Sequence, residues 1–306
     1  MKATVLFYAF GFLCLMGCSS GIQTVRIQGL EGRQEIADKH EVIVVPDSGV
    51  EASHYQIIGK IFFERGVNGF DYITNAQILQ NLKEPAQAMG GEALIGLHYH
   101  SFSVNGATGL RWASALVGRS NFAGAENKRN VLGVAILPPT DSSADVDSAA
   151  KVEENSIMVT SAQYYLEKAG YYALPVSSPV TILAKAIRNK EVVDIDTLGG
   201  LDAGFVLMTE GRIKGSAHSV ARSAKAEIGL YLYSKETHSI VWEDSTYEAI
   251  SSPLTPLTMG LTSGPVGAVA GVLVNLFDNA RTAALTDALQ KMLKTVKPPA
   301  NAVISK

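Results

Sequence analysis

The chain has 306 residues, of which 47% are hydrophobic and 18% are charged, with a formal net charge of −3 at pH 7. This is the composition of a folded protein, and the length suits one or two domains. A slightly negative chain has no general attraction for nucleic acid, so no nucleic-acid partner is expected. The two cysteines, Cys14 and Cys18, both lie near the amino terminus. The remaining chain therefore offers no disulfide, no cysteine metal ligand and no cysteine nucleophile.

The first 17 residues have the layout of a secretory signal peptide. A lysine at position 2 precedes an apolar run that is too short to cross a bilayer as a helix, which needs about 20 residues. The run ends in Leu15-Met16-Gly17-Cys18, which resembles the lipobox of bacterial lipoprotein precursors. The resemblance implies cleavage before Cys18 and membrane anchoring by lipid on that residue. The alternative is an ordinary signal peptide cut elsewhere. Ser19, where retained enteric lipoproteins have Asp, favours the outer membrane by analogy.

Changes in composition predict the domain organisation. Residues 18–40 are polar and are predicted to be a tether, and residues 297–306 are predicted to be a loose tail. A second polar stretch, 140–155, is predicted to be a gap between elements. We expect an α+β protein with two small αβ sandwich domains in tandem behind the signal peptide, spanning 41–126 and 127–296.

The first domain is predicted to have the order β-β-α-β. Apolar runs at 42–45 and 55–63 and a segment at 92–102 are typical of strands. Between the last two, a helix from about Asn75 has an apolar stripe and stops at Gly90-Gly91. Pro85 lies within this helix and is expected to kink or split it.

The second domain is predicted to open with a β-α-β unit. A strand at 131–137, a helix with Met158 and Tyr165 on its apolar face, and a strand at 171–176 follow one another. Such a crossover makes the two strands parallel. The later predicted elements are a helix from Ser178, a central strand at 203–209, an antiparallel pair at 225–233 and 239–244, and a closing helix at 275–294.

The segment LKEPAQAMGGEALIGL, residues 82–97, resembles a motif of the YbjQ-like and RcsF-like families of small αβ domains. Some YbjQ-like domains are labelled heavy-metal-binding, so the resemblance directs attention to His98 and His100. These two residues project from one face of a strand. Two histidines are half of a tetrahedral site, and no motif places a third ligand. We therefore expect a solvated strand face, with no metal and no other cofactor.

Four segments of the second half resemble segments of another family and follow one another in the same order as in that family. They are Val134–Pro139, Tyr165–Val176, Leu201–Gly204 and Ile240–Trp242. This half resembles bacterial lipoproteins related to the TolB amino-terminal, LpoB and CsgG group. The resemblance implies αβ sandwiches without known catalysis, found beside envelope transport or curli-type assembly components, and a core position for Trp242. One ambiguity stays open, because the strand at 131–137 could instead close the sheet of the first domain.

No catalytic motif is present in the sequence, so an enzyme is not expected. The acids Glu243-Asp244 and the pair Asp194 and Asp196 are expected to be turn and surface groups. One apolar segment, 259–271, has regularly spaced glycines between a strand and the closing helix. It either packs under its own domain or is covered by another chain. We expect the second arrangement, with Val266 and Val269 in contact with an envelope partner or a second copy.

These patterns predict a lipid-anchored protein of the cell envelope, on the outer membrane and facing the periplasm. Its expected role is that of a non-catalytic interaction or accessory module of an envelope export or assembly system. The alternative is a small-molecule or metal-sensing envelope protein, or an enzyme without a recognisable motif.

Overall fold

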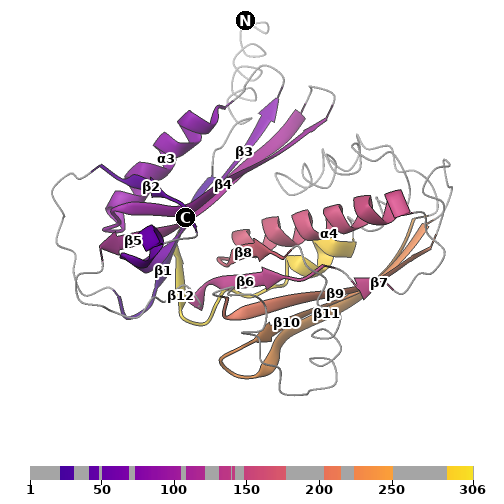
Figure 1. Cartoon of the computed structure of the whole chain (residues 1–306). Coiled ribbons are helices and arrows are strands. Elements are labelled where there is room, and N and C mark those ends of the chain that lie inside the picture. The colour runs from indigo at the N-terminus through magenta and orange to yellow at the C-terminus, as the bar shows by residue number, and fades with distance from the viewer. Residues whose placement is uncertain are drawn as a thin grey trace, which may run out of the picture.

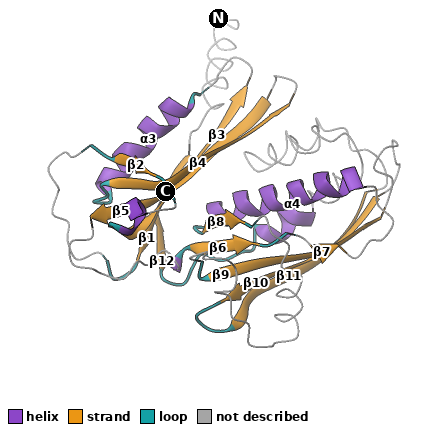
Figure 2. Ribbon diagram, viewed as in Figure 1, coloured by secondary structure: helices purple, strands orange, loops and turns teal. Residues whose placement is uncertain are grey.

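The computed structural model describes residues 21–30, 41–47, 50–68, 73–104, 108–120, 131–138, 140–141, 148–176, 203–214, 224–250 and 288–305. These residues form two mixed β-sheets with few helices, which confirms an α+β protein with two sheet-based domains (Figures 1 and 2). The elements are β1 (Gly21–Ile27), β2 (Ile43–Val45), α2 (Val50–Ser53), β3 (Tyr55–Asn68), α3 (Asn75–Ala88), β4 (Ala93–Val104), β5 (Thr108–Ser120), β6 (Gly133–Ile136), β7 (Thr140–Asp141), α4 (Ser148–Lys168), β8 (Tyr172–Pro175), β9 (Phe205–Lys214), β10 (Ala224–Ser234), β11 (Ser239–Ile250) and β12 (Ala302–Ser305).

The first sheet corrects the prediction at both ends of the chain. Its strand order is β12-β1-β3-β5-β4-β2, so it contains residues from the predicted tether and from the predicted loose tail. β1 takes Gly21–Ile27 out of the tether because Val25 and Ile27 alternate with polar residues and are buried. β12 pairs antiparallel with β1, with Thr24 opposite Ser305. The chain therefore returns from the second sheet to complete the first one.

Helix α3 covers one face of the first sheet, packing Ile78, Leu82 and Ala86 against the strands. It begins at the capping box of Thr74 and Gln77, in which each side chain accepts the other's backbone N–H. The helix runs through Pro85 and is not split there. Pro85 lies near the carboxyl end, where Gly90, with φ of 80°, lets the chain turn into β4.

The second sheet has the order β11-β10-β9-β6-β8, with the short β7 beside β9. β6 pairs parallel with β8 across α4, which confirms the β-α-β unit and places the strand at 131–137 in the second sheet. β9 lies between β10 and β6 and is buried along Val206–Thr209, as expected for a central strand. The antiparallel pair of β10 and β11 is also confirmed. Trp242 packs partly buried against the core of this sheet.

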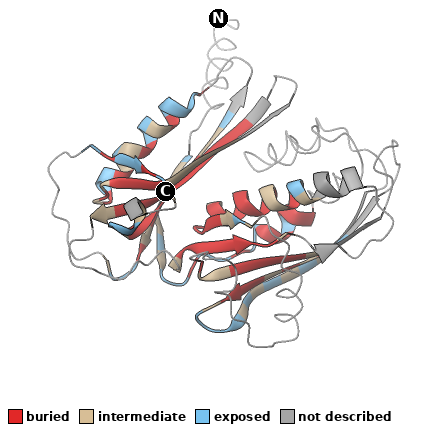
Figure 3. Ribbon diagram, viewed as in Figure 1, coloured by how far each residue is buried: buried red, intermediate tan, exposed pale blue. Residues whose placement is uncertain are grey.

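Helix α4 lies between the two sheets. Residues Ser161–Glu167 are all buried, so this stretch has no solvent face (Figure 3). A single core cluster joins Phe62 and Trp112 of the first sheet, Tyr164 and Tyr165 of α4, and Val134 of the second sheet. The gap between elements that was expected at 140–155 is partly wrong, since β7 and the first turns of α4 lie in it.

Several predicted features lie outside the described residues. They are the signal peptide, Cys18, the helix from Ser178, and the segment 259–271 with Val266 and Val269. Of the closing helix at 275–294, the structure describes residues 288–293 as helical. Over the described ranges, no helix is both long enough and apolar enough to span a bilayer.

Candidate functional site

His98 and His100 lie on β4 and face α4, so the expectation of a solvated strand face is wrong. Their imidazole rings are 5.2 Å apart between centroids and meet edge to face. The pairing of β4 with β5 shifts register between Ile95 and His98, and Gly96 in this irregularity has φ of 63°. The irregularity sets which face of the sheet receives the histidines, because a one-residue shift exchanges the two faces.

His98 contacts a buried carboxylate on α4. Its Nε2 lies 2.7 Å from Oε1 of Glu167, whose side chain is fully buried. Its Nδ1 lies 3.1 Å from the carbonyl oxygen of Gly96. Both neighbours are acceptors, so both contacts become hydrogen bonds when each ring nitrogen carries a proton, and the site favours the imidazolium form.

Lys60 of β3 approaches the same point of α4. Its ammonium group is fully buried and donates to the backbone carbonyl of Glu167 at 2.6 Å. Burial lowers the pKa of Lys60 to about 8, although the nearby Glu167 carboxylate opposes this change. The Glu167 carboxylate thus has two cationic groups near it inside the protein.

The pKa directions in this cluster follow from burial and charge together. Burial acts to raise the pKa of Glu167, but His98 and Lys60 outweigh it and hold the pKa below its usual value. Burial likewise acts to lower the pKa of His98, and the Glu167 carboxylate outweighs it, so that pKa is raised. The charged form of each partner is therefore favoured by the other.

His100 is held in the opposite protonation state. Its Nε2 lies 3.0 Å from Nε2 of Gln163, and because an amide nitrogen can only donate, His100 accepts this bond and is neutral. Its ring stacks on Trp112 with centroids 4.7 Å apart. Burial and the neighbouring positive charge of His98 lower the pKa of His100 to about 4. The site thus favours the charged form of His98 and the neutral form of His100.

A second ion pair joins α4 to β3. Lys168 of α4 donates to both carboxylate oxygens of Glu64 on β3, each at 2.9 Å. Tyr164 donates its hydroxyl to Glu64 at 2.7 Å. Burial and the Glu64 carboxylate raise the pKa of Tyr164 far above its usual value, so the hydroxyl keeps its proton. Along β3, Lys60 and Glu64 therefore both bond to α4.

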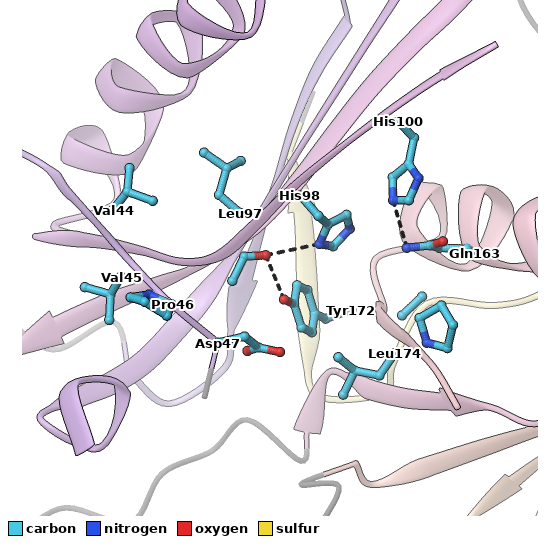
Figure 4. Close-up of a pocket in the computed structure, with 13 residues that line it drawn as sticks. Val44, Val45, Pro46, Asp47, Leu97, His98, His100, Gln163, Tyr172 and Leu174 are labelled. Atoms are coloured by element: carbon cyan, nitrogen blue, oxygen red, sulfur yellow. Dashed lines mark hydrogen bonds between the residues drawn. The ribbon is translucent and has the colours of Figure 1, made fainter. Parts of the chain in front are cut away.

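A cavity of about 570 Å³ opens beside the histidines (Figure 4). Apolar side chains from β2, β4 and β8 form most of its wall, including Val44, Leu97 and Leu174. The polar part of the wall consists of Asp47, His98, His100, Gln163 and Tyr172. Its volume lies within the range of small-molecule sites, although the cavity is wide open to solvent.

Gly96 forms the corner of the cavity where the sheets meet. Its carbonyl accepts from the hydroxyl of Tyr172 at 2.8 Å as well as from His98, as Figure 4 shows. A β-carbon at this position would lie 2.2 Å from the Tyr172 hydroxyl and 2.8 Å from Oδ1 of Asp47. The bond from Tyr172 of β8 thus requires glycine here.

The metal expectation can be compared with this geometry. His98 and His100 are together, but Glu167 and Gln163 occupy their Nε2 atoms. In the part of the chain that the structure describes, no three His, Cys, Asp or Glu side chains are grouped to hold a metal ion. The arrangement is chemically suited to fixing α4 on the first sheet by ion pairs, and to binding a ligand beside them.

The sequence prediction missed Lys60, Glu64, Gln163 and Glu167. A signal was present for Lys60, because this lysine interrupts an apolar strand, where a charge needs a buried partner. For Glu167 the signal was a carboxylate next to the buried Leu166. Neither pattern predicts that Lys60 and Glu167 are partners, because 107 positions separate them in the sequence.

No protein-family model matches the chain, and no curated protein matches it. Among solved structures, the chain is similar to the PelC dodecamer of Paraburkholderia phytofirmans, at 11% identity over 65% of this chain and 98% of that one, with a TM-score of 0.30. It is similar to lipoprotein GNA1162 of Neisseria meningitidis, at 17% identity over 48% and 97% of the two chains, with a TM-score of 0.28.

A third similarity is to the LpoB carboxy-terminal domain of Escherichia coli, at 13% identity over 41% of this chain and 87% of that one, with a TM-score of 0.21. LpoB belongs to the group that the second half resembles in sequence. TM-scores this low do not assign a family, so that resemblance and the one to the YbjQ-like and RcsF-like families stay predictions.

Proposed function

We propose that this chain is a lipoprotein of the cell envelope, anchored through Cys18, on the outer membrane and facing the periplasm. Its proposed role is that of a non-catalytic interaction or accessory module in an export or assembly system. The observation that carries the anchor is the sequence Leu15–Cys18 at the end of a short apolar run. Two or three acyl chains on one residue give stable membrane binding, where one would be marginal.

The non-catalytic part of the proposal is supported by how the ionisable side chains are used. Glu167 and the Gly96 carbonyl hold both ring nitrogens of His98. Gln163 fixes His100 as a neutral acceptor. These bonds keep α4 against the first sheet, which gives the residues a structural role.

Metabolic labelling with palmitate tests the anchor. The wild-type chain and Cys14→Ser are expected to incorporate label and to stay with membranes. Cys18→Ser is expected to lose both, because the acylated residue is gone. Equal labelling of wild type and Cys18→Ser would contradict the anchor.

The proposed partner is an envelope protein or a second copy of the chain, with Val266 and Val269 in the contact. Replacing both with Asp is expected to abolish co-purification of the partner while the melting temperature changes by no more than a degree or two. Val241→Asp is a matched control, because Val241 is exposed on β11. If the double variant instead unfolds several kcal/mol more easily, as charge burial in a core demands, these valines pack inside the protein.

The cavity beside the histidines favours one second candidate, a small-molecule or metal-sensing protein. A zinc titration of the purified chain distinguishes the two. The proposed function expects no rise in melting temperature. A rise that His100→Ala removes would support sensing, since His100 lies in the cavity wall.

A further inference from the structure

We propose that the ends of β3, β4 and β5 rest on the lipid headgroups of the membrane that carries the anchor. The proposal rests on the lipidation of Cys18 proposed above. It adds an orientation, since it names the part of the folded body that meets the bilayer. The first observation is the position of β1, which begins near the start of the tether that the sequence predicts.

The anchor and the fold are close together along the chain. β1 begins at Gly21, three residues after Cys18. Three residues extend at most about 10 Å even when fully stretched. A lipid on Cys18 therefore holds the amino-terminal end of β1 next to the membrane surface, because no long tether separates Cys18 from the first strand.

Three other strands run past the end of β1 on this side. β1 and β3 are antiparallel, and Gly21 lies opposite Glu64. β3 continues to Asn68, which lies opposite Thr108 of β5, and Thr108 in turn lies opposite Val104 of β4. At about 3.3 Å per residue, the four residues after Glu64 extend roughly 13 Å beyond Gly21. The strand ends thus extend at least as far beyond Gly21 as the segment between Gly21 and Cys18 can. Figure 1 shows β3 and β4 projecting from the rest of the molecule on this side.

The composition of these ends suits a lipid surface. The segments 65–68, 101–104 and 108–111 contain no acidic residue and two arginines, Arg65 and Arg111. Bacterial headgroups include anionic lipids, which attract cations and repel carboxylates. Arg111 is buried and its guanidinium donates to the carbonyl of Ile73, so Arg65, which is partly exposed, is the arginine of these segments that faces outward.

Fluorescence quenching in lipid vesicles tests the orientation. Gly66→Cys places a thiol on the projection, where Gly66 is exposed and an added β-carbon meets no atom within 4 Å. Gln28→Cys is the matched control, because Gln28 is exposed and follows the far end of β1, about 23 Å from Gly21. Neither native cysteine leaves a free thiol after the proposed processing, so only the introduced one takes an environment-sensitive dye.

The lipidated full-length variants are placed in vesicles of phosphatidylethanolamine and phosphatidylglycerol that contain a headgroup spin label. Quenching is expected to be several-fold stronger at position 66 than at position 28. Inserting about ten Gly and Ser residues between Ser20 and Gly21, which adds a mean reach of roughly 18 Å, is expected to remove this difference.

Each outcome separates the two proposals. Equal quenching at both positions in a palmitate-labelled, vesicle-bound protein overturns the orientation and leaves the anchor intact, because the body then lies in some other way. A protein that carries no palmitate and does not bind vesicles overturns the anchor and the orientation together. Stronger quenching at 28 than at 66 also rejects the orientation, since it reverses the end that meets the lipid.

Discussion

The buried carboxylate of Glu167 is stabilised by nearby positive charges more than by hydrogen bonds. Its Oε1 accepts from His98, but its Oε2 is buried and has no hydrogen-bond partner among the described residues. An unpaired buried oxygen is unfavourable, and it is tolerated here because two cationic groups, on His98 and Lys60, lie nearby. Any change that neutralises Glu167 leaves both of those charges buried without their counterion.

Glu167→Gln is therefore expected to lower the free energy of unfolding by about 3–5 kcal/mol, the usual effect of removing one member of a buried ion pair. Urea denaturation followed by circular dichroism measures it. Glu41→Gln serves as a control, because Glu41 is exposed and pairs with Lys83 at the surface. The control is expected to lose less than about 1 kcal/mol. Equal losses in the two variants would mean that the Glu167 charge has no buried partner.

The histidines predict a pH dependence of stability. The folded pKa of His100 is lowered to about 4, so the unfolded chain binds more protons below pH 6.5, and stability falls with pH from there towards 4. The folded pKa of Glu167 is also lowered, which adds to the loss in acid. The folded pKa of His98 is raised, so its contribution is complete below pH 6.5 and is lost as the pH rises through the folded value. Between pH 4 and pH 8, below the range in which Lys60 titrates, stability is therefore expected to be greatest near pH 6.5.

His100→Gln tests the acid side of this profile, because glutamine cannot take up a proton. The variant is expected to lose less stability than wild type between pH 6.5 and 4.5 in urea titrations. Parallel profiles for the two proteins would show that His100 does not titrate abnormally in the folded state.

At the scale of elements, the irregularity in β4 connects the two sheets. Gly96→Ala places a β-carbon against Tyr172 and forces a positive φ, which is unfavourable by about 1–2 kcal/mol for an L-residue. The variant is expected to have a lower melting temperature, which corresponds to a loss of at least about 1–2 kcal/mol in the free energy of unfolding. Gly66→Ala is the matched control, because its β-carbon meets open space. A Gly96→Ala protein as stable as the control would mean that the contact of Tyr172 with β4 contributes nothing.

Elements with a clear apolar pattern were predictable from the sequence, and others, such as β1 and β5, were not. β2, β3, α3, β6, β8, β9 and the pair of β10 and β11 occur where periodicity placed them. β5 was missed because small residues such as Ala113, Ser114 and Ala115 are buried on both of its faces, so it has no alternation. β1 lacks a clear strand pattern because Gln23, which is polar, occupies one of its inward positions.

The candidate site was predictable only in part. The spacing of His98 and His100 identifies them as a pair, but it does not predict that α4 and not solvent covers them. The strand pattern shows that the two side chains share a face, and it does not show what covers that face. Here α4 covers it, and α4 is a helix of the second half of the chain.

For the whole molecule, α4 makes the two sheets one packing unit. It bonds to Lys60 and Glu64 of the first sheet and is part of the β-α-β unit of the second. The chain is therefore expected to unfold in a single transition. Trp242→Phe leaves Trp112 in the first sheet as the sole tryptophan. Its fluorescence and the far-ultraviolet circular dichroism are expected to give the same urea midpoint. Separate midpoints would show that the sheets unfold independently.

The position of β1 predicts which truncated chains fold. A chain that begins at Gly21 keeps β1, whereas one that begins at Lys39 loses Val25 and Ile27, both buried. Burial of each such side chain contributes about 1.5–3 kcal/mol, so the shorter chain is expected to be less stable by roughly 3–6 kcal/mol. Its melting temperature, compared with that of the chain from Gly21, measures the effect. Similar melting temperatures would mean that β1 adds nothing to the first sheet.

The pairing of β1 with β12 also sets a folding order. If the chain is exported amino terminus first, β1 reaches the periplasm long before β12 does. Until then β1 has an unpaired edge, which is the kind of surface on which other chains add. Closing a loop of this length is slow, because the contact lies between residues far apart in sequence. On the proposed export route, the chain thus passes through a period in which β1 offers a defined edge for a chaperone to protect.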